Sequence, residues 1–358
     1  MAISELPWLY FATIFLSLSQ FRIHHSAFTN SIHHSMNNLT WELAHLAHVE
    51  LYTPAFDQSL RFFSEILGMY ITEIKDTSAY LRAYDDYEHH TLKLTPYKHA
   101  GMGHFAWRTR SADALHQRVH AIESAGLGIG WIDHECSYGK AYRFKYPDGH
   151  LCELYFDSNK YKPIEETRSA LKNTNSRFPG RGMNVRRIDH LNLLAKDIYA
   201  FKDFQLNVLG GRMTETIRFE EETKGVWISV NNKSYDLAIT EDHSGLNGRF
   251  HHLTYAVNSR EEVLLAADIA LENNVFIETG PHKHAIQQTF FLYLYEPGGN
   301  RIEIANPTAR LILDPDYETI VWNREERSKG QAWGLKTVES FHTRGTPTMD
   351  ELNNNSGQ

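Results

Sequence analysis

The chain is poor in cysteine, in basic charge and in long apolar runs. Its two cysteines, Cys136 and Cys152, have no CxxC spacing, which argues against a disulfide framework and a cysteine-based zinc site. Lys and Arg total 36 against 44 Asp and Glu, a formal net charge of -8. This balance argues against nucleic acid as a partner. The apolar run from Pro7 to Phe21 is shorter than the roughly 20 residues of a membrane helix, so membrane contact is not expected.

The two ends of the chain differ in composition from the rest. We interpret residues 1–40 as an extension, with Met36 as the natural start, and keep a membrane anchor or a signal peptide as alternatives. Residues 309–340 are predicted to form an arm that packs on the second domain. Residues 341–358 are polar and are predicted to be a disordered tail. Because no transmembrane pattern interrupts the central part, we expect a cytoplasmic protein.

An internal repeat organises the central part. His48 and His190 each open an alternating strand pattern that continues as an amphipathic helix and stops at Leu-Gly. Leu67 and Leu209 lie at the same distance from their histidines, and the glycine that follows each is typical of a helix C-terminus.

Two further segment pairs follow in the same order: residues 103–127 with 251–275, and residues 142–156 with 293–307. Each half then contains two strand–helix–strands units. The sequence therefore predicts an α+β fold of four tandem βαβββ units in two homologous domains, residues 43–160 and 185–308, joined by a linker over 161–184.

Histidine is abundant, with 21 copies, and imidazole is the commonest metal ligand. His190 and His252 lie near the starts of predicted strands, and Glu303 lies on the last strand of the second domain. Two imidazoles and one carboxylate form the facial triad associated with non-haem Fe(II). Their equivalent positions in a repeated unit favour this interpretation.

Residues 284–303, HAIQQTFFLYLYEPGGNRIE, resemble the signature of the type I extradiol ring-cleavage dioxygenases, which have the vicinal oxygen chelate fold. The signature falls on His284, Tyr293 and Glu303, with the Pro-Gly-Gly turn between the last two. The resemblance extends over residues 43–340 and is nearest to the catechol and homoprotocatechuate 2,3-dioxygenase branch.

The resemblance implies that His190, His252 and Glu303 ligate Fe(II), with Mn(II) as the alternative metal. We choose His252 over His251 because, counted back from Val257, it is the one that matches the ligand strand of the family. Successive strand residues face opposite sides of a sheet, so both cannot easily ligate. His251 is expected to be a partly exposed neighbour.

The resemblance also implies the substrates and their contacts. His284 would hydrogen-bond the substrate or oxygen, and Tyr293 would hold the ionised catechol oxygen. Asn192 would point to the oxygen pocket, and Trp227 would form a wall or belong to the core. The implied reaction is extradiol cleavage of a catechol by O₂ to a muconic semialdehyde, in aromatic compound degradation, by a homo-oligomer.

Two residues depart from the family pattern: His282, where a small or β-branched residue is usual, and Tyr235, which matters for the chemistry. Tyr235 stands where the family has an acid/base histidine, and a tyrosine is a poor base but a good hydrogen-bond donor at neutral pH. Three interpretations stay open. Tyr235 donates its hydroxyl to oxygen in the site, or His284 or His243 takes the base role, or the chain is a weak or differently specific member.

The first domain has the same three residue types as the proposed ligands. Its equivalents are His48, His104 and Glu153, with His90 near the Tyr235 position and His134 near the His284 position. Arg143 replaces the catechol-binding tyrosine. The family's first domain is usually a metal-free remnant, so we expect an empty structural half and keep a second metal site as the alternative.

Two other functions are alternatives to ring cleavage. One is a glyoxalase-type metal-dependent lyase or isomerase, against which His284 and Tyr293 argue. The other is a non-enzymatic binding protein of the same fold, against which the complete triad argues. The basic residues at 310, 324, 327 and 329 are interpreted as solvated surface charges, with a substrate carboxylate as the alternative partner.

Overall fold

The computed structural model of the 358-residue chain describes residues 41–133, 139–306, 310–328 and 331–348. The expected extension over residues 1–40 lies outside these ranges, and so do Cys136 and His134. Among the described residues, no helix has the length and apolar character needed to cross a membrane.

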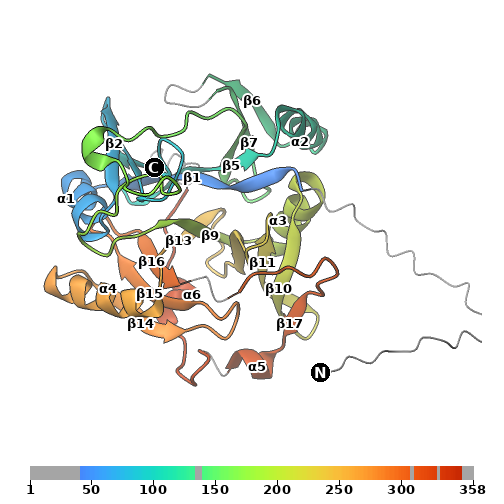
Figure 1. The fold of residues 1–358 in the computed structure, drawn as a ribbon. Helices are drawn as coiled ribbons and strands as arrows, with labels where there is room; N and C mark the ends of the chain where they lie inside the picture. The colour runs from blue at the N-terminus through green and yellow to red at the C-terminus, as the bar shows by residue number, and fades with distance from the viewer. Residues whose placement is uncertain (1–40, 134–138, 307–309, 329–330, 349–358) are drawn as a thin grey trace, which may run out of the picture. The chain divides into compact units, whose positions relative to one another are not determined.

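The first half contains two βαβββ units in sequence (Figure 1). They are β1 (Leu43–Thr53), α1 (Phe56–Arg61) continued by η1 (Phe62–Ile66), β2 (Tyr70–Lys75), β3 (Ser78–Arg82), β4 (Leu92–Pro96), β5 (Gly101–Thr109), α2 (Ala112–Ser124), β6 (Gly128–Ile132), β7 (Ala141–Lys145) and β8 (Leu151–Tyr155).

The second half repeats this order, after η2 (Glu165–Thr167) in the linker. Its elements are β9 (Arg187–Ala195), α3 (Ile198–Phe204) continued by η3 (Gln205–Leu209), β10 (Arg212–Phe219), β11 (Glu222–Ser229), β12 (Leu237–Glu241), β13 (Arg249–Ala256), α4 (Arg260–Glu272), β14 (Ile277–Lys283), β15 (Phe290–Tyr295) and β16 (Arg301–Asn306). Then follow β17 (Ile320–Trp322), α5 (Arg324–Ser328) and α6 (Glu339–Thr343). The predicted α+β fold of four βαβββ units is confirmed.

Each half forms one sheet, and corresponding strands follow the same order when the second sheet is read from its other edge. The second sheet has one additional edge strand, β17. The first sheet runs β2-β3-β4-β1-β5-β8-β7-β6, and the second runs β14-β15-β16-β13-β9-β12-β11-β10-β17. The opening strands of the two units pair antiparallel at the centre, and each is flanked by a parallel closing strand. In the second sheet this arrangement sets β9, β13 and β16 side by side.

The two long helices, α2 and α4, each begin with a serine cap. The Ser111 side chain accepts a hydrogen bond from the Ala114 N–H at the start of α2, and Ser259 does the same from Glu262 at the start of α4. Such caps satisfy backbone donors that have no partner within the helix.

Residues 341–348 are ordered, so the expectation of a disordered tail from residue 341 is wrong for this stretch. Thr346 and Phe250 exchange two backbone hydrogen bonds of 2.8 and 2.9 Å, and the Met102 N–H donates to Pro347 O at 3.0 Å. The segment thus pairs with β5 of one sheet and β13 of the other. Backbone pairing and the burial of Thr348 compensate for its polar composition.

Candidate metal centre

Strand register gathers the three predicted ligands on one face of the second sheet. Thr254 on β13 lies opposite His190 on β9 and also opposite Glu303 on β16. His252 is two residues from Thr254, so it faces the same side. One donor atom from each of His190, His252 and Glu303 lies within 4.8 Å of the others, and all three residues are buried.

The Glu303 carboxylate is held between imidazoles. Its Oε2 lies 2.9 Å from His190 Nε2 and 3.4 Å from His252 Nε2, and its Oε1 lies 3.6 Å from His284 Nε2. Burial alone would raise the pKa of Glu303, but the histidines hold it well below its usual range. The buried carboxylate is therefore ionised at neutral pH.

A neighbouring carboxylate orients His190. Asp189 Oδ2 lies 2.8 Å from His190 Nδ1. Burial would raise the pKa of Asp189, but Lys233 and His190 lower it below its usual range. An ionised carboxylate only accepts hydrogen bonds, so His190 Nδ1 donates. A neutral His190 then presents the Nε2 lone pair to the site, as metal-ligating histidines do.

His251 is buried, so the expectation of a partly exposed neighbour is wrong. Its side chain is 1% exposed, and its Nδ1 lies 2.6 Å from Nδ1 of His252. Burial lowers the pKa of His252 to about 4, although Glu303 opposes the shift. His252 is therefore a neutral imidazole at physiological pH.

The donor set fits a divalent first-row cation. His252 Nε2 and Glu303 Oε1 are buried and have no hydrogen-bond partner in the described part of the chain. Unsatisfied buried polar atoms are costly, and a cation between the three residues would satisfy both. Two imidazoles and one carboxylate suit Fe(II) or Mn(II).

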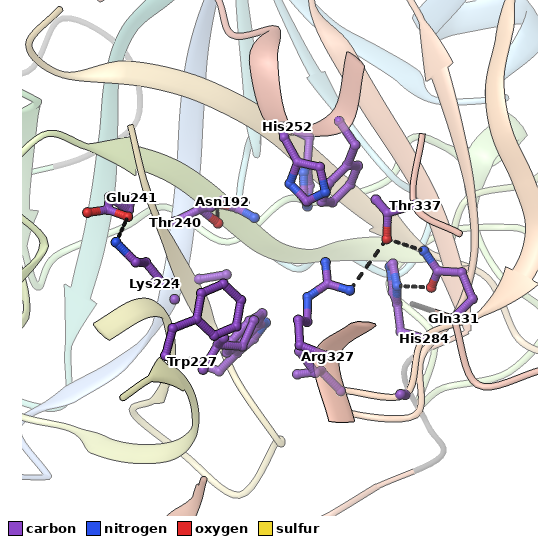
Figure 2. A pocket seen from close by; sticks show the side chains of 18 of the residues that line it. Asn192, Lys224, Trp227, Thr240, Glu241, His252, His284, Arg327, Gln331 and Thr337 are labelled. Carbon is purple, nitrogen blue, oxygen red and sulfur yellow. Dashed lines mark hydrogen bonds and ion pairs between the residues drawn. The ribbon is translucent and has the colours of Figure 1, made fainter. Parts of the chain in front are cut away.

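A cavity of about 700 Å³ opens onto this cluster (Figure 2). It brings together the predicted residues, which came from several separate motifs: His190, Asn192, Trp227, Tyr235, His252, His284 and Tyr293. Sequence reasoning missed a set of lining residues from the arm and the last helix: Gln331, Lys336, Thr337, Phe341 and His342.

His284 and Tyr293 form one hydrogen-bonded pair on the cavity wall. His284 Nε2 lies 3.1 Å from the Tyr293 hydroxyl, and its Nδ1 lies 2.9 Å from Gln331 Oε1. The His284 ring stacks on Phe291 with centroids 3.8 Å apart. Burial raises the pKa of Tyr293 well above its usual range, so its hydroxyl keeps its proton and can donate.

Tyr235 is placed beside the first predicted ligand. Its hydroxyl lies 3.0 Å from His190 Nε2, and the two ring centroids are 4.2 Å apart. Burial raises the pKa of Tyr235 well above its usual range, so it is a hydrogen-bond donor at neutral pH. His243, an alternative base, is 70% exposed and lies 3.2 Å from Glu241.

The basic residues differ in their surroundings. Arg310 pairs with the buried Glu215 at 2.6 Å, so its interpretation as a solvated charge is wrong. Arg327 lines the cavity, and burial lowers its pKa. In the described part of the chain its hydrogen-bond partner is Thr337, at 3.4 Å, and no carboxylate pairs with it. Arg327 is thus half-buried at the cavity wall, where a substrate carboxylate, the alternative partner, could reach it. Residue 329 lies outside the described residues.

The first half holds a second cluster of the same composition. One donor atom from each of His48, His104 and Glu153 lies within 4.8 Å of the others. Here His48 Nε2 lies 3.0 Å from His104 Nε2, and Arg143 donates to Glu153 Oε1 at 2.8 Å. A guanidinium thus neutralises the carboxylate that in the second half lies among imidazoles.

Known proteins are similar to this chain in sequence and in fold. The family described as "Glyoxalase/Bleomycin resistance protein/Dioxygenase superfamily" matches residues 45–154 and 187–304. A metapyrocatechase of Geobacillus stearothermophilus is 41% identical over 309 residues, 86% of this chain and 94% of the relative. A manganese-dependent 2,3-dihydroxybiphenyl 1,2-dioxygenase of Geobacillus genomosp. 3 is 36% identical over 300 residues, 82% of this chain and 95% of the relative.

Solved structures agree on the fold. An extradiol ring-cleaving dioxygenase from B. fuscum gives a TM-score of 0.76 at 24% identity, covering 86% of this chain and 84% of that one. A 2,3-dioxygenase from Pseudomonas sp. KL28 gives a TM-score of 0.72 at 24% identity, covering 79% of this chain and 98% of that one. With both matched segments and the 41% identity, the chain belongs to the Glyoxalase/Bleomycin resistance protein/Dioxygenase superfamily.

Proposed function

We propose that this protein is an extradiol dioxygenase that opens a catechol ring with O₂ at a site formed by His190, His252 and Glu303. The observation that carries the proposal is the position of this triad at one cavity together with the His284–Tyr293 pair. The metapyrocatechase of Geobacillus stearothermophilus supports the catechol substrate, since this chain covers 94% of its length. When bound, Fe(II) or Mn(II) would bind the catechol oxygens and O₂ and favour the ionised form of the substrate.

Tyr293 and His284 orient the substrate. The buried Tyr293 hydroxyl donates a hydrogen bond to the ionised catechol oxygen. Gln331 presents Oε1 to His284 Nδ1 while its Nε2 faces Thr337, so His284 Nδ1 carries the hydrogen. With the hydrogen on Nδ1, His284 Nε2 accepts from the Tyr293 hydroxyl at 3.1 Å in the structure. When Tyr293 donates to the substrate instead, Nε2 can accept the proton of the second catechol hydroxyl.

Tyr235 acts as a donor in this scheme. Its buried hydroxyl keeps its proton at neutral pH, so it stabilises negative charge that develops near His190. Asn192 is buried on the same face and lines the cavity. We assign it to the oxygen side of the pocket. The base role therefore goes to His284, because His243 is largely exposed.

Arg327 is proposed to meet a ring substituent. The cavity of about 700 Å³ is within the range of pockets for ligands larger than a bare ring. A half-buried guanidinium that lines the cavity and has no carboxylate partner among the described residues favours an anionic group. Replacing Arg327 with Met should weaken turnover of homoprotocatechuate more than that of catechol, as a ratio of the two kcat/KM values. Equal losses would remove Arg327 from this role.

The proposal includes a cytoplasmic homo-oligomer without nucleic-acid partners. The net charge of -8 supports the last point. Analytical ultracentrifugation of the purified chain measures the oligomeric state, and a monomer would contradict that part.

Oxygen uptake tests the reaction directly. Protein purified without air and reloaded with Fe(II), or separately with Mn(II), is mixed with catechol while O₂ and visible absorbance are recorded. We expect stoichiometric O₂ uptake and a yellow semialdehyde. With metal confirmed bound, no uptake on catechol, substituted catechols and homoprotocatechuate would overturn the proposal.

A further inference from the structure

We propose that His251 is a positioning residue that fixes the tautomer of His252 through a hydrogen-bond relay from the last helix. The relay runs from the Phe341 carbonyl to His251, from His251 to His252, and from His252 to the proposed metal position. It rests on the proposed role of His252 as a ligand.

The backbone carbonyl fixes the direction of the relay. His251 Nε2 lies 2.7 Å from Phe341 O, and a carbonyl oxygen only accepts hydrogen bonds. His251 Nε2 therefore carries the hydrogen. A neutral imidazole has one N–H, so His251 Nδ1 is an acceptor.

The second link follows from the first. His251 Nδ1 and His252 Nδ1 are 2.6 Å apart, so one of these atoms must donate. Since His251 Nδ1 accepts, His252 Nδ1 donates, and a neutral His252 has a bare Nε2. That atom is buried without a hydrogen-bond partner in the described part of the chain, 3.4 Å from Glu303 Oε2. The relay thus presents the lone pair that a metal ligand needs.

The carbonyl at the start of the relay is held in place. Arg301 donates to Ser340 O and to Arg344 O, each at 3.0 Å, on either side of Phe341. Arg301 is itself paired with Glu278 at 2.6 Å. The Phe341 ring also packs edge-on against His251, with centroids 4.6 Å apart. Arg301 and the Phe341 ring therefore hold α6 in place beside His251, which precedes the proposed ligand His252.

In the first half a different residue, Glu50, accepts the hydrogen bond from the corresponding histidine. His104, which corresponds to His252, has its Nδ1 2.9 Å from Glu50 Oε2. The residue before it is Gly103, where an added Cβ would lie 2.4 Å from Glu50 Oε2. In the second half Asn192 corresponds to Glu50, and His251 corresponds to Gly103. His251 thus supplies the acceptor without adding a negative charge.

Metal affinity of three variants tests the relay. His251→Leu removes the acceptor, whereas in His251→Asn the amide oxygen can accept from His252 Nδ1. His150→Leu is the matched control, because His150 is also buried and bonds a backbone carbonyl, Arg249 O at 3.1 Å, but lies in the first half. Mn(II) binding is measured from the EPR signal of the free ion, without catechol or O₂.

We expect His251→Leu to weaken Mn(II) binding by about 10–100-fold, with His251→Asn and His150→Leu close to the unmodified protein. Equal losses in the two His251 variants, or no loss in His251→Leu, would overturn the relay.

Imidazole ¹⁵N spectra of the metal-free, unmodified protein give a second readout that does not depend on the folding of the His251 variants. The His252 signal is assigned by its absence from the spectrum of His252→Gln. A proton on His252 Nδ1 supports the relay, and a proton on Nε2 contradicts it. If the protein binds no Mn(II) at all, the proposed metal site fails, while these spectra still decide the relay.

Discussion

The two halves of the molecule place the same three residue types on the same three strands, but surround them differently. Thr254 and Tyr293 lie opposite Glu303 on the neighbouring strands: the Thr254 hydroxyl donates to Glu303 Oε2 at 2.6 Å, and Tyr293 lines the cavity. Around Glu153 the corresponding residues are Ala106 and Arg143. Two histidines and a glutamate close together are therefore not enough to identify a metal site. The residues paired with the carboxylate decide whether a cation from solution or a guanidinium of the chain neutralises it.

The orientation of the imidazoles also differs. In the second half the carboxylate of Asp189 orients His190, and a neutral histidine orients His252. In the first half Ala47 stands at the Asp189 position, and the carboxylate Glu50 orients His104 instead. Duplication thus conserved the donors while their supporting residues diverged.

The largest expected contrast is between the two glutamates. Glu303→Gln removes the carboxylate of the proposed site, and loss of metal catalysis is worth several kcal/mol, about a thousandfold or more in rate. Glu153→Gln should leave ring cleavage intact. O₂ uptake and metal content per chain are measured for both variants. The reverse pattern would place the working metal in the first half.

Tyr293→Phe should lower kcat/KM for catechol by about 100-fold, because one donor to a developing oxyanion is lost. Tyr255→Phe is the control, since it removes another buried hydroxyl of the second half that does not line the cavity. Metal content should not change in either variant. Full activity in Tyr293→Phe would show that substrate orientation comes from another residue.

His150 in the first half corresponds to Asn300 in the second half, and of the two only the histidine can bind a proton in acid. The free energy of unfolding should therefore depend on pH through His150. Burial lowers the pKa of His150 to about 4, partly opposed by bonds to backbone carbonyls. The unfolded chain then binds more protons between pH 6.5 and 4, so stability falls as the pH falls through this window. Between pH 7 and 4, the free energy of unfolding should fall by about 3 kcal/mol less in His150→Asn than in the unmodified protein.

Urea unfolding at several pH values measures this difference, with His243→Asn as the exposed control. Parallel stability curves for the unmodified protein and His150→Asn would contradict the assignment of the acid transition to His150.

The smallest effect is expected at Arg143. Arg143→Gln leaves the buried Glu153 without its guanidinium, but the Arg143 side chain is 38% exposed, so water screens the pair and we expect a loss of about 2 kcal/mol. Adding Glu153→Gln should restore part of this stability. A double-mutant cycle by urea unfolding measures the coupling, and a value near zero would mean that the pair does not replace a bound cation energetically.

The repeat made much of the structure predictable from sequence. His190, His252 and Glu303 occupy strand positions that recur in both halves, and the match to the family's ligand strand selected His252 over His251. These inferences depend on local period and on fixed spacing, which survive without tertiary information.

The surroundings of the site were less accessible. Phe341 and Gln331 lie after the repeat, in segments with no periodic pattern, so their contacts depend on the path of the chain over the sheets. His251 was expected to be partly exposed because alternation turns it away from His252, but α6 covers that side. Arg327 was interpreted from composition alone, and composition does not show which face of a short helix meets a cavity.

The segment from Gln331 to Thr348 is synthesised after every strand of the two sheets, yet it provides one wall of the cavity and the carbonyl that His251 contacts. Domains fold in order as they are made, so the sheets can form while this wall is still missing. A chain that ended just before Phe341 would contain every strand of both sheets but would lack the cavity-lining residues Phe341 and His342. The cavity is therefore completed only after residues 331–348 have been made and packed against sheets that are already complete in sequence.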